Sequence, residues 1–407
     1  MNISKIKVSD CVLIFETILL VPVLLVQQIA SVYEYYYVRW ILTVILSLLL
    51  MASWSAYYMN RKMIDSSQRF SPWVSIVFAA FVFTSLISSF LNRDMNNFHV
   101  GMFSIISYID AYLLISYSNK TGKIRQCIYT IFIFLFMICA INDILMAIMP
   151  NRFAGNGLYI LYSKYNICYL HLLLISLSVY LYGSRAIISI ALWIITLAVS
   201  FYTKCGTGTI GVVAYLCLML IGFTELKKIL MKPVAVPVFM ICSGFFTALN
   251  SFVLDFPIVR FVVVNVLGKS IDLTSRIFIY KIIDLIVFRK PIFGFGLENN
   301  YAACQKYLVL NTYEAAPDVQ NGLFDLSISY GVVGTIVFMT MVTVLLGRGT
   351  AKGGHYCFIA LALSFIVMAS VEIPYGSIFF LIVLLYAFCS DQKHYPEGSV
   401  VSLGLMR

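Results

Sequence analysis

Long apolar runs alternate with short polar segments along most of the chain, and one longer polar stretch interrupts them late. A membrane-spanning helix needs about 20 mostly apolar residues, so each run is a candidate span. The pattern predicts twelve transmembrane helices at about 11–29, 38–59, 73–91, 98–117, 126–148, 165–182, 186–202, 208–223, 233–250, 322–346, 356–370 and 373–389. We therefore expect an all-α polytopic membrane protein with three parts: nine spans in 1–250, a large polar loop at 251–321, and three spans with a tail in 322–407.

Composition agrees with this pattern. Hydrophobic residues make up 61% of the 407 and charged residues 11%, with a mean hydropathy of +0.93. Soluble domains carry about 25% charged residues, so the chain belongs to the membrane class. The net charge of +10 is spread between apolar runs, which argues against the concentrated basic face that nucleic-acid binding requires. The ten cysteines form no C-x-x-C pair, and no metal-ligand spacing occurs.

Basic residues follow an alternating rule that orients the spans. If the N-terminus is cytoplasmic, the connections rich in lysine and arginine, such as 60–71, 118–125 and 224–232, all fall on the cytoplasmic side. The opposite connections hold few basic residues. This predicts that both termini are cytoplasmic and that the 251–321 loop faces outward. Cys205 and Cys304 are the two cysteines in predicted outer segments, and a disulfide between them stays open.

The 251–321 loop contains most of the candidate chemistry. Residues 276–288 place charges at helical spacing among isoleucines, which predicts an amphipathic helix lying in the membrane interface. Arg289-Lys290-Pro291 ends that helix. Gly294-Phe295-Gly296 then predicts a turn where the missing side chains let the backbone bend or approach a ligand closely.

Four acidic residues fall within predicted spans, where a charge is costly and tends to be paired or functional. We expect Glu16 and Asp110 to hydrogen-bond to neighbouring helices. Asp143, which follows Asn142 near the outer end of its span, is expected to line a polar cavity. Asp325 is the fourth. A proton-coupled carrier would use such residues too, so they do not decide between an enzyme and a transporter.

The order of motifs in the last third resembles the C-terminal signature of the O-antigen ligase and polymerase superfamily. The pieces are Ser275-Arg276, Pro291-Ile-Phe-Gly294-Phe-Gly296, Gln320-Asn321 and Tyr330-Gly331-Val-Val-Gly334. The resemblance implies a polytopic enzyme of the bacterial inner membrane with a large periplasmic loop. It also implies glycan transfer from an undecaprenyl diphosphate carrier without a metal or other cofactor. A polysaccharide chain-length regulator would be a further partner.

Two positions depart from the family pattern. The family usually has His-Asn where this chain has Gln320-Asn321, and no other histidine lies in the loop, which favours a polymerase over a ligase. A family feature with Ser-Arg at the outer end of a middle span corresponds here to Thr203-Lys204. Lysine keeps the charge but loses the bidentate fork that suits phosphate.

Glycan transfer from a lipid diphosphate needs cations to neutralise the leaving group and a base to take the acceptor proton. Our candidates for the cations are Arg276, then Arg289 and Lys204, and finally Arg260. Arg289 could equally anchor the interfacial helix among lipid headgroups. Such an anchor would serve no catalytic purpose.

Asp318 is our first candidate for the base, and Glu298 is the second. Each could also be a solvated loop acid. The amide of Gln320 is a candidate to orient a sugar hydroxyl. Asn321 is either a substrate ligand or the N-cap of the following helix, and the cap is the preferred interpretation.

The resemblance thus implies a polymerase of undecaprenyl-diphosphate-linked oligosaccharide repeat units in surface polysaccharide (O-antigen) biosynthesis. It would transfer the growing glycan onto the next lipid-linked unit on the periplasmic face. An O-antigen ligase and a flippase of lipid-linked oligosaccharides are the alternatives. Flippases generally lack a long outer loop between late spans.

Overall fold

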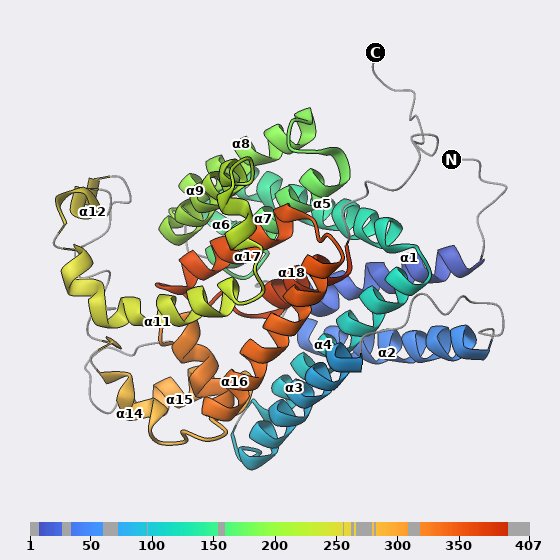
Figure 1. The fold of residues 1–407 in the computed structure, drawn as a ribbon, viewed down its shortest axis with the longest axis horizontal. Helices are drawn as coiled ribbons and strands as arrows, with labels where there is room; N and C mark the ends of the chain where they lie inside the picture. The colour runs from blue at the N-terminus through green and yellow to red at the C-terminus, as the bar shows by residue number, and fades with distance from the viewer. Residues whose placement is uncertain are drawn as a thin grey trace.

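The computed structural model describes residues 8–26, 34–59, 72–95, 97–153, 159–254, 256–261, 264–265, 279–280, 282–307 and 318–389. These residues form helices and no strand (Figure 1). Seven helical stretches are long and apolar enough to cross a membrane. They are α1 with its continuation η2 (Val8–Leu20, Val21–Leu25), α2 (Tyr35–Met59), α3 (Pro72–Leu91), α4 (Phe98–Lys120), α5 (Ile124–Ile148), α7 (Lys164–Tyr182) and α16 (Gly322–Ala351).

Five further apolar helices complete the bundle: α8 (Ile187–Tyr202), α9 (Gly206–Ile221), α11 (Ala235–Leu254), α17 (Tyr356–Ala369) and α18 (Ser377–Phe388). Short helices lie in the connections: α6 (Pro150–Phe153), α10 (Leu226–Leu230), α12 (Pro257–Phe261), α14 (Asp284–Val287) and α15 (Asn300–Tyr307). Each of the twelve segments predicted to span the membrane carries one of the apolar helices. The all-helical, multi-pass class predicted from the sequence is therefore confirmed.

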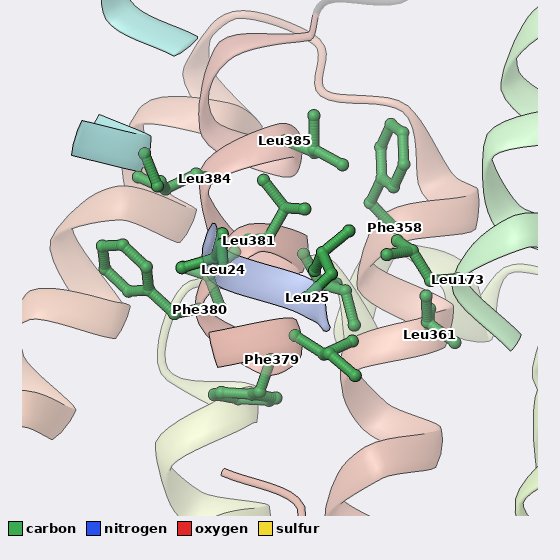
Figure 2. Close-up of a cluster of buried hydrophobic side chains, with 14 of the residues drawn as sticks. Leu24, Leu25, Leu173, Phe358, Leu361, Phe379, Phe380, Leu381, Leu384 and Leu385 are labelled. Atoms are coloured by element: carbon green, nitrogen blue, oxygen red, sulfur yellow. The ribbon is translucent and has the colours of Figure 1, made fainter. Parts of the chain in front are cut away.

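The centre of the bundle is formed by helices that are apolar on every face. Every residue of α18 is buried, and so is nearly all of α17 and most of α7. A helix that is hydrophobic all round is typical of such an interior position. Figure 2 shows how Leu24 and Leu25 of η2 insert beside Leu381 and Leu385 of α18, with Phe358 of α17 close by.

The π-helical stretch η2 follows from Pro22, whose ring removes a backbone donor and widens the turn. Side chains from α2 satisfy carbonyl oxygens of this stretch. The hydroxyl of Tyr35 donates to the carbonyl of Val26 at 2.9 Å, and Nε of Arg39 donates to that of Val23 at 2.9 Å. The irregular turn is therefore fixed by α2.

The described part of the 251–321 loop has a small core of its own. Ile279, Ile283 and Ile286 are buried against Phe295 and Cys304, and the cluster continues to Val319 and to Ile328 of α16. In Figure 1, α14 and α15 lie beside α16 at the lower left. Of the amphipathic helix predicted at 276–288, the structure describes 279–280 and 282–288, and their isoleucines pack inward on this cluster. The placement of this helix in the membrane interface stays a prediction.

Two ends of the bundle can be distinguished. At one end, which we call the loop end, lie residues 92–95, 97, 159–163, 203–205, 282–307 and 371–376. At the opposite end lie the connections 121–123, 183–186, 222–234 and 352–355. The loop end is the side that the charge pattern predicts to face outward.

Candidate functional site

The site is organised by a break in α16. Gly331 has non-helical dihedrals, with φ of 67° and ψ of −176°, and divides α16 into two arms. The break removes helical partners from backbone groups on both sides of it. Segment 291–296 supplies the missing partners. Phe295 N donates to Ile328 O at 2.7 Å, and Gly296 N donates to Ser329 O at 3.0 Å.

The same pairing continues on the far side of the break. Val332 N donates to Pro291 O at 2.8 Å, and Val333 N donates to Ile292 O at 3.2 Å. Buried backbone groups without partners would be costly, so the loop segment and the bent helix stabilise each other. The two glycine motifs noted in the sequence therefore form one joint.

Both glycines at this joint are required by space as well as by conformation. Gly294 has φ of +66°, and a Cβ added there would lie 2.5 Å from Gly331 N. A Cβ added at Gly331 would lie 2.5 Å from Phe293 N. The sequence predicted at Gly294-Phe295-Gly296 a turn that bends or approaches a ligand closely, and the structure shows these residues packed closely against α16.

The end of α3 fixes the joint from a third side. The hydroxyl of Ser88 donates to the carbonyls of Phe293 and Ser329, and the amide of Asn92 donates to Gly294 O at 3.0 Å. Nζ of Lys290 donates to the side-chain oxygen of Asn92. Lys290 thus has a structural role in holding the loop.

Glu298 is positioned by this joint and by the start of α4. It has a φ of +65°, a region that non-glycine residues rarely adopt, and such strain often marks functional sites. Ser104 donates to its Oε1 at 2.8 Å, and the amide of Asn97 donates to its main-chain oxygen at 3.0 Å. At Gly101 a Cβ would lie 2.6 Å from Leu297 O, so the glycine lets the loop pack against α4.

Beside Glu298 opens a polar cavity of about 630 Å³ at the loop end. Three carboxylates line it, together with several tyrosine and asparagine side chains. They are Glu298, Asp318 and Glu372; Tyr162, Tyr165, Tyr169 and Tyr301; and Asn97, Asn166 and Asn300. The structure thus brings the two predicted bases, Asp318 and Glu298, into one cavity. No lysine or arginine is among the described residues that line it.

The foot of α16 closes the cavity near Asp318. The Asp318 carboxylate accepts a hydrogen bond from Gln320 N at 2.9 Å, and Gln320 has a φ of +48°. The carbonyl of Gln320 accepts from the Tyr280 hydroxyl at 2.9 Å. Asn300, another lining residue, donates to Asp325, which is therefore partnered within the same network.

Asn321 is the N-cap of α16, as the preferred interpretation of the sequence held. Its side-chain oxygen accepts from Leu323 N at 3.1 Å and from Phe324 N at 3.3 Å. Its side-chain nitrogen donates to the carbonyls of Ser243 and Ser370, each at 3.2 Å. Because both ends of this buried amide are engaged, Asn321 joins α11, α16 and α17 and does not line the cavity.

The three predicted cations that the structure describes are not among the residues that line the cavity. Arg289 is exposed, with its guanidinium over the ring of Tyr307 at 5.7 Å. Lys204 is exposed in the turn before α9, with a φ of +51°, and Arg260 is exposed in α12. Arg276 lies outside the described residues.

Two residues that line the cavity were not singled out by the sequence reasoning. Tyr169 of α7 is 5% exposed and lines the cavity, and its hydroxyl has no hydrogen-bond partner among the described residues. Glu372 is 5% exposed and lines the cavity from the connection between α17 and α18. The available sequence signal was its position two residues before Pro374, in a predicted outer turn.

Arg39 of α2 was also missed, and it is not among the residues that line the cavity. It is 7% exposed, and its Nη2 has no hydrogen-bond partner among the described residues. Glu298 is the acidic residue whose charge acts on Arg39 most strongly. The only sequence signal for Arg39 was its position just inside the predicted outer end of the span 38–59. An arginine there is ordinarily assigned to the connecting loop.

The intramembrane acids are paired, as expected for two of them. Glu16 accepts from the Ser53 hydroxyl at 2.6 Å, and Asp110 accepts from the Ser47 hydroxyl at 2.9 Å. Asp143 lies 3.3 Å from Nε2 of the buried His171 on α7, a partner that the sequence did not indicate. Asp143 and Asn142 are not among the residues that line the cavity at the loop end.

Cys205 and Cys304, the two cysteines considered together from the sequence, form no disulfide with each other. Cys304 is buried in the small core of the loop, where burial raises the pKa of its thiol well above the usual value, and the charges of Asp325 and Asp318 raise it further. Cys205 lies at the start of α9, packed against Cys168 of α7.

No protein-family model, curated protein or solved structure matches this chain. The class of protein is therefore defined here by its fold and by the residues of the site. The chain is an α-helical, multi-pass membrane protein with an acidic, tyrosine-rich cavity at one end of its bundle.

Proposed function

We propose that this protein is a glycosyltransferase that polymerises lipid-linked oligosaccharide repeat units in the bacterial inner membrane. The proposal includes twelve spans, cytoplasmic termini and an outward-facing loop end, as the charge pattern predicts. The substrate is an undecaprenyl-diphosphate-linked oligosaccharide, as the family resemblance implies. An O-antigen ligase would use the same donor and a different acceptor.

The observation that carries the proposal is the shared cavity of Glu298 and Asp318. Carboxylates and asparagine amides hydrogen-bond sugar hydroxyls, and tyrosine rings offer flat surfaces for sugar faces. The unpartnered hydroxyl of Tyr169 favours a ligand that supplies a hydrogen bond, because a buried polar group without a partner is costly. A cavity of about 630 Å³ suits a small oligosaccharide segment.

In the proposed reaction, the bond between the anomeric carbon and the diphosphate oxygen breaks. A new bond forms from that carbon to an acceptor hydroxyl oxygen. Glu298 takes the hydroxyl proton, since Ser104 holds Oε1 and leaves the second carboxylate oxygen for the acceptor. The lipid diphosphate departs with the bonding electron pair. Arg276 remains the first candidate to neutralise it, and Arg39 is the buried cation on the Glu298 side.

The test uses purified protein, its lipid-linked repeat unit and no nucleotide sugar. We expect a ladder of products with wild type and a loss of about 10²–10⁴-fold with Glu298→Gln, the usual contribution of a positioned base. Asp318→Asn and Arg276→Ala are measured beside it. The matched control is Glu225→Gln, whose carboxylate is exposed at the opposite end and pairs with Lys228.

The other outcomes decide between alternatives. If wild type makes no ladder but moves the lipid-linked unit across a vesicle bilayer, the flippase replaces the polymerase. If a ladder persists in Glu298→Gln and fails in Asp318→Asn, the enzyme stands and the base is Asp318. Transfer to a non-repeating acceptor without elongation identifies the ligase.

A further inference from the structure

Two cysteine thiols meet at the loop end of the bundle. Cys168 lies in the second turn of α7, and Cys205 is the N-cap of α9, where its Sγ accepts a hydrogen bond from Gly208 N at 3.3 Å. Both side chains are buried, at 0% and 1% exposure. The pair is separated by 36 residues that include α8, so it connects two different helices.

The two sulfur atoms both border the space left by the missing side chain of Gly208. A Cβ at residue 208 would lie 2.8 Å from Cβ of Cys168 and 3.1 Å from Sγ of Cys205, with Sγ of Cys168 closer still. The two thiols hydrogen-bond to each other. Residue 208 therefore has to lack a side chain for this contact to exist, and the contact brings the two sulfurs within reach of a covalent bond.

We propose that Cys168 and Cys205 form a disulfide bond in the mature protein. The inference depends on the predicted outward position of the loop end, because disulfides form and persist in oxidising compartments. It does not depend on the proposed polymerase activity. In the reaction, each thiol loses one proton and one electron and the sulfurs join. A disulfide-bonded oxidoreductase of the outer compartment accepts both electrons and both protons and becomes a dithiol.

The bond would fix one wall of the acidic cavity. Tyr165, Asn166 and Tyr169 of α7 line that cavity, and Cys168 lies among them in the same two turns. Linking Cys168 to the first residue before α9 would hold this part of α7 against α9. The cross-link would act mainly by restricting the unfolded chain, as for other loops of this length.

The experiment counts thiols in protein taken directly from cells. Membranes are acid-quenched, denatured in SDS and labelled with a maleimide-polyethylene glycol before and after reduction. Of the ten cysteines, we expect eight to be labelled before reduction and ten after it in wild type. Cys168→Ser and Cys205→Ser should each show nine labelled thiols under both conditions, and Cys139→Ser, a buried cysteine of α5, should show seven and nine.

The linkage is then identified directly. Non-reducing digestion with trypsin should give peptides 165–185 and 205–227 joined through Cys168 and Cys205, with Cys217 of the second peptide free. Reduction of the purified protein should lower its Tm by on the order of 5 °C, and neither single serine variant should respond to reductant. Ten labelled thiols before reduction, or linkage only after copper phenanthroline is added, would overturn the proposal.

Discussion

The bundle has a cavity of about 630 Å³ at each end, and the two differ in almost everything except volume. The described residues that line the cavity at the opposite end all belong to three neighbouring helices, α2, α3 and α4. Its chemistry is that of a membrane interface: Trp54, Tyr58 and Lys120, with the lysine ammonium 5.5 Å above the Trp54 ring. No carboxylate is among the described residues that line it.

The cavity at the loop end draws its lining from connections far apart in the chain. Glu298, Asp318 and Glu372 come from three separate segments, and Tyr169 comes from a fourth. Glu298 is held in a strained backbone conformation by contacts from α4. Convergence of polar groups on strained backbone indicates a functional site, whereas a hollow between adjacent helices needs only imperfect packing and lipid. This difference, and not size, selects the loop end.

The substitution with the largest expected effect tests whether the joint between 291–296 and α16 supports the loop-end cavity. Gly294→Ala places a methyl group against α16 and forces an alanine into left-handed backbone. We expect a loss of about 3 kcal/mol or more in stability, or failure to fold. Gly122→Ala is the control, because Gly122 has a similar φ of +70° with nothing within 4 Å and should lose only about 1–2 kcal/mol. Thermal unfolding in detergent measures the loss of stability in both variants. Equal losses would contradict the conclusion that Gly294 has to be a glycine because α16 packs against it.

The next effect concerns the unpartnered hydroxyl in the cavity. Tyr169→Phe should reduce glycan transfer by about tenfold, the equivalent of one lost hydrogen bond to a ligand, and leave the Tm unchanged or slightly higher. Tyr215→Phe, a buried tyrosine of α9 that lines neither cavity, should leave transfer unchanged. A fall in Tm with no change in transfer would assign Tyr169 to packing alone.

A smaller effect is expected on the reactivity of Cys304, which reports on the negative charge near the loop-end cavity. Burial, Asp325 and Asp318 all raise the pKa of Cys304, so its thiol should stay protonated and react slowly with iodoacetamide at pH 8. Asp318→Asn removes one negative charge and therefore lowers this pKa. The thiolate fraction and the alkylation rate should rise severalfold, followed by mass spectrometry of the tryptic peptide that carries Cys304. An unchanged alkylation rate would show that the charge of Asp318 lies too far from Cys304 to affect the pKa of its thiol.

The smallest effect is expected at the other cavity. Lys120→Met removes the ammonium from the rings of Trp54 and Tyr57 and should cost about 0.5–1 kcal/mol of stability with no loss of transfer. Both quantities come from the ladder assay and thermal unfolding already described. A loss of transfer as large as that of Glu298→Gln would contradict the conclusion that only the cavity at the loop end is functional.

Helix positions were largely predictable because hydrophobic run length is a local signal. All twelve predicted segments carry apolar helices, and local chemistry also identified Asn321 as a cap. The break in α16 was not predicted, because it depends on pairing with a segment about 35 residues earlier in the chain. Tyr169 was missed for a related reason: inside an apolar helix, sequence alone does not tell which polar side chain faces a cavity.

The joint between 291–296 and α16 also has a consequence for how the protein is made. The backbone groups exposed by the bend at Gly331 are matched by a segment that leaves the ribosome first. When α16 emerges, its docking partner is already present, so the bend can close without waiting for later helices. If 282–307 came after α16 in the chain, α16 would reach the membrane with four backbone groups at the bend still unmatched. Synthesis order is thus part of what this helix requires.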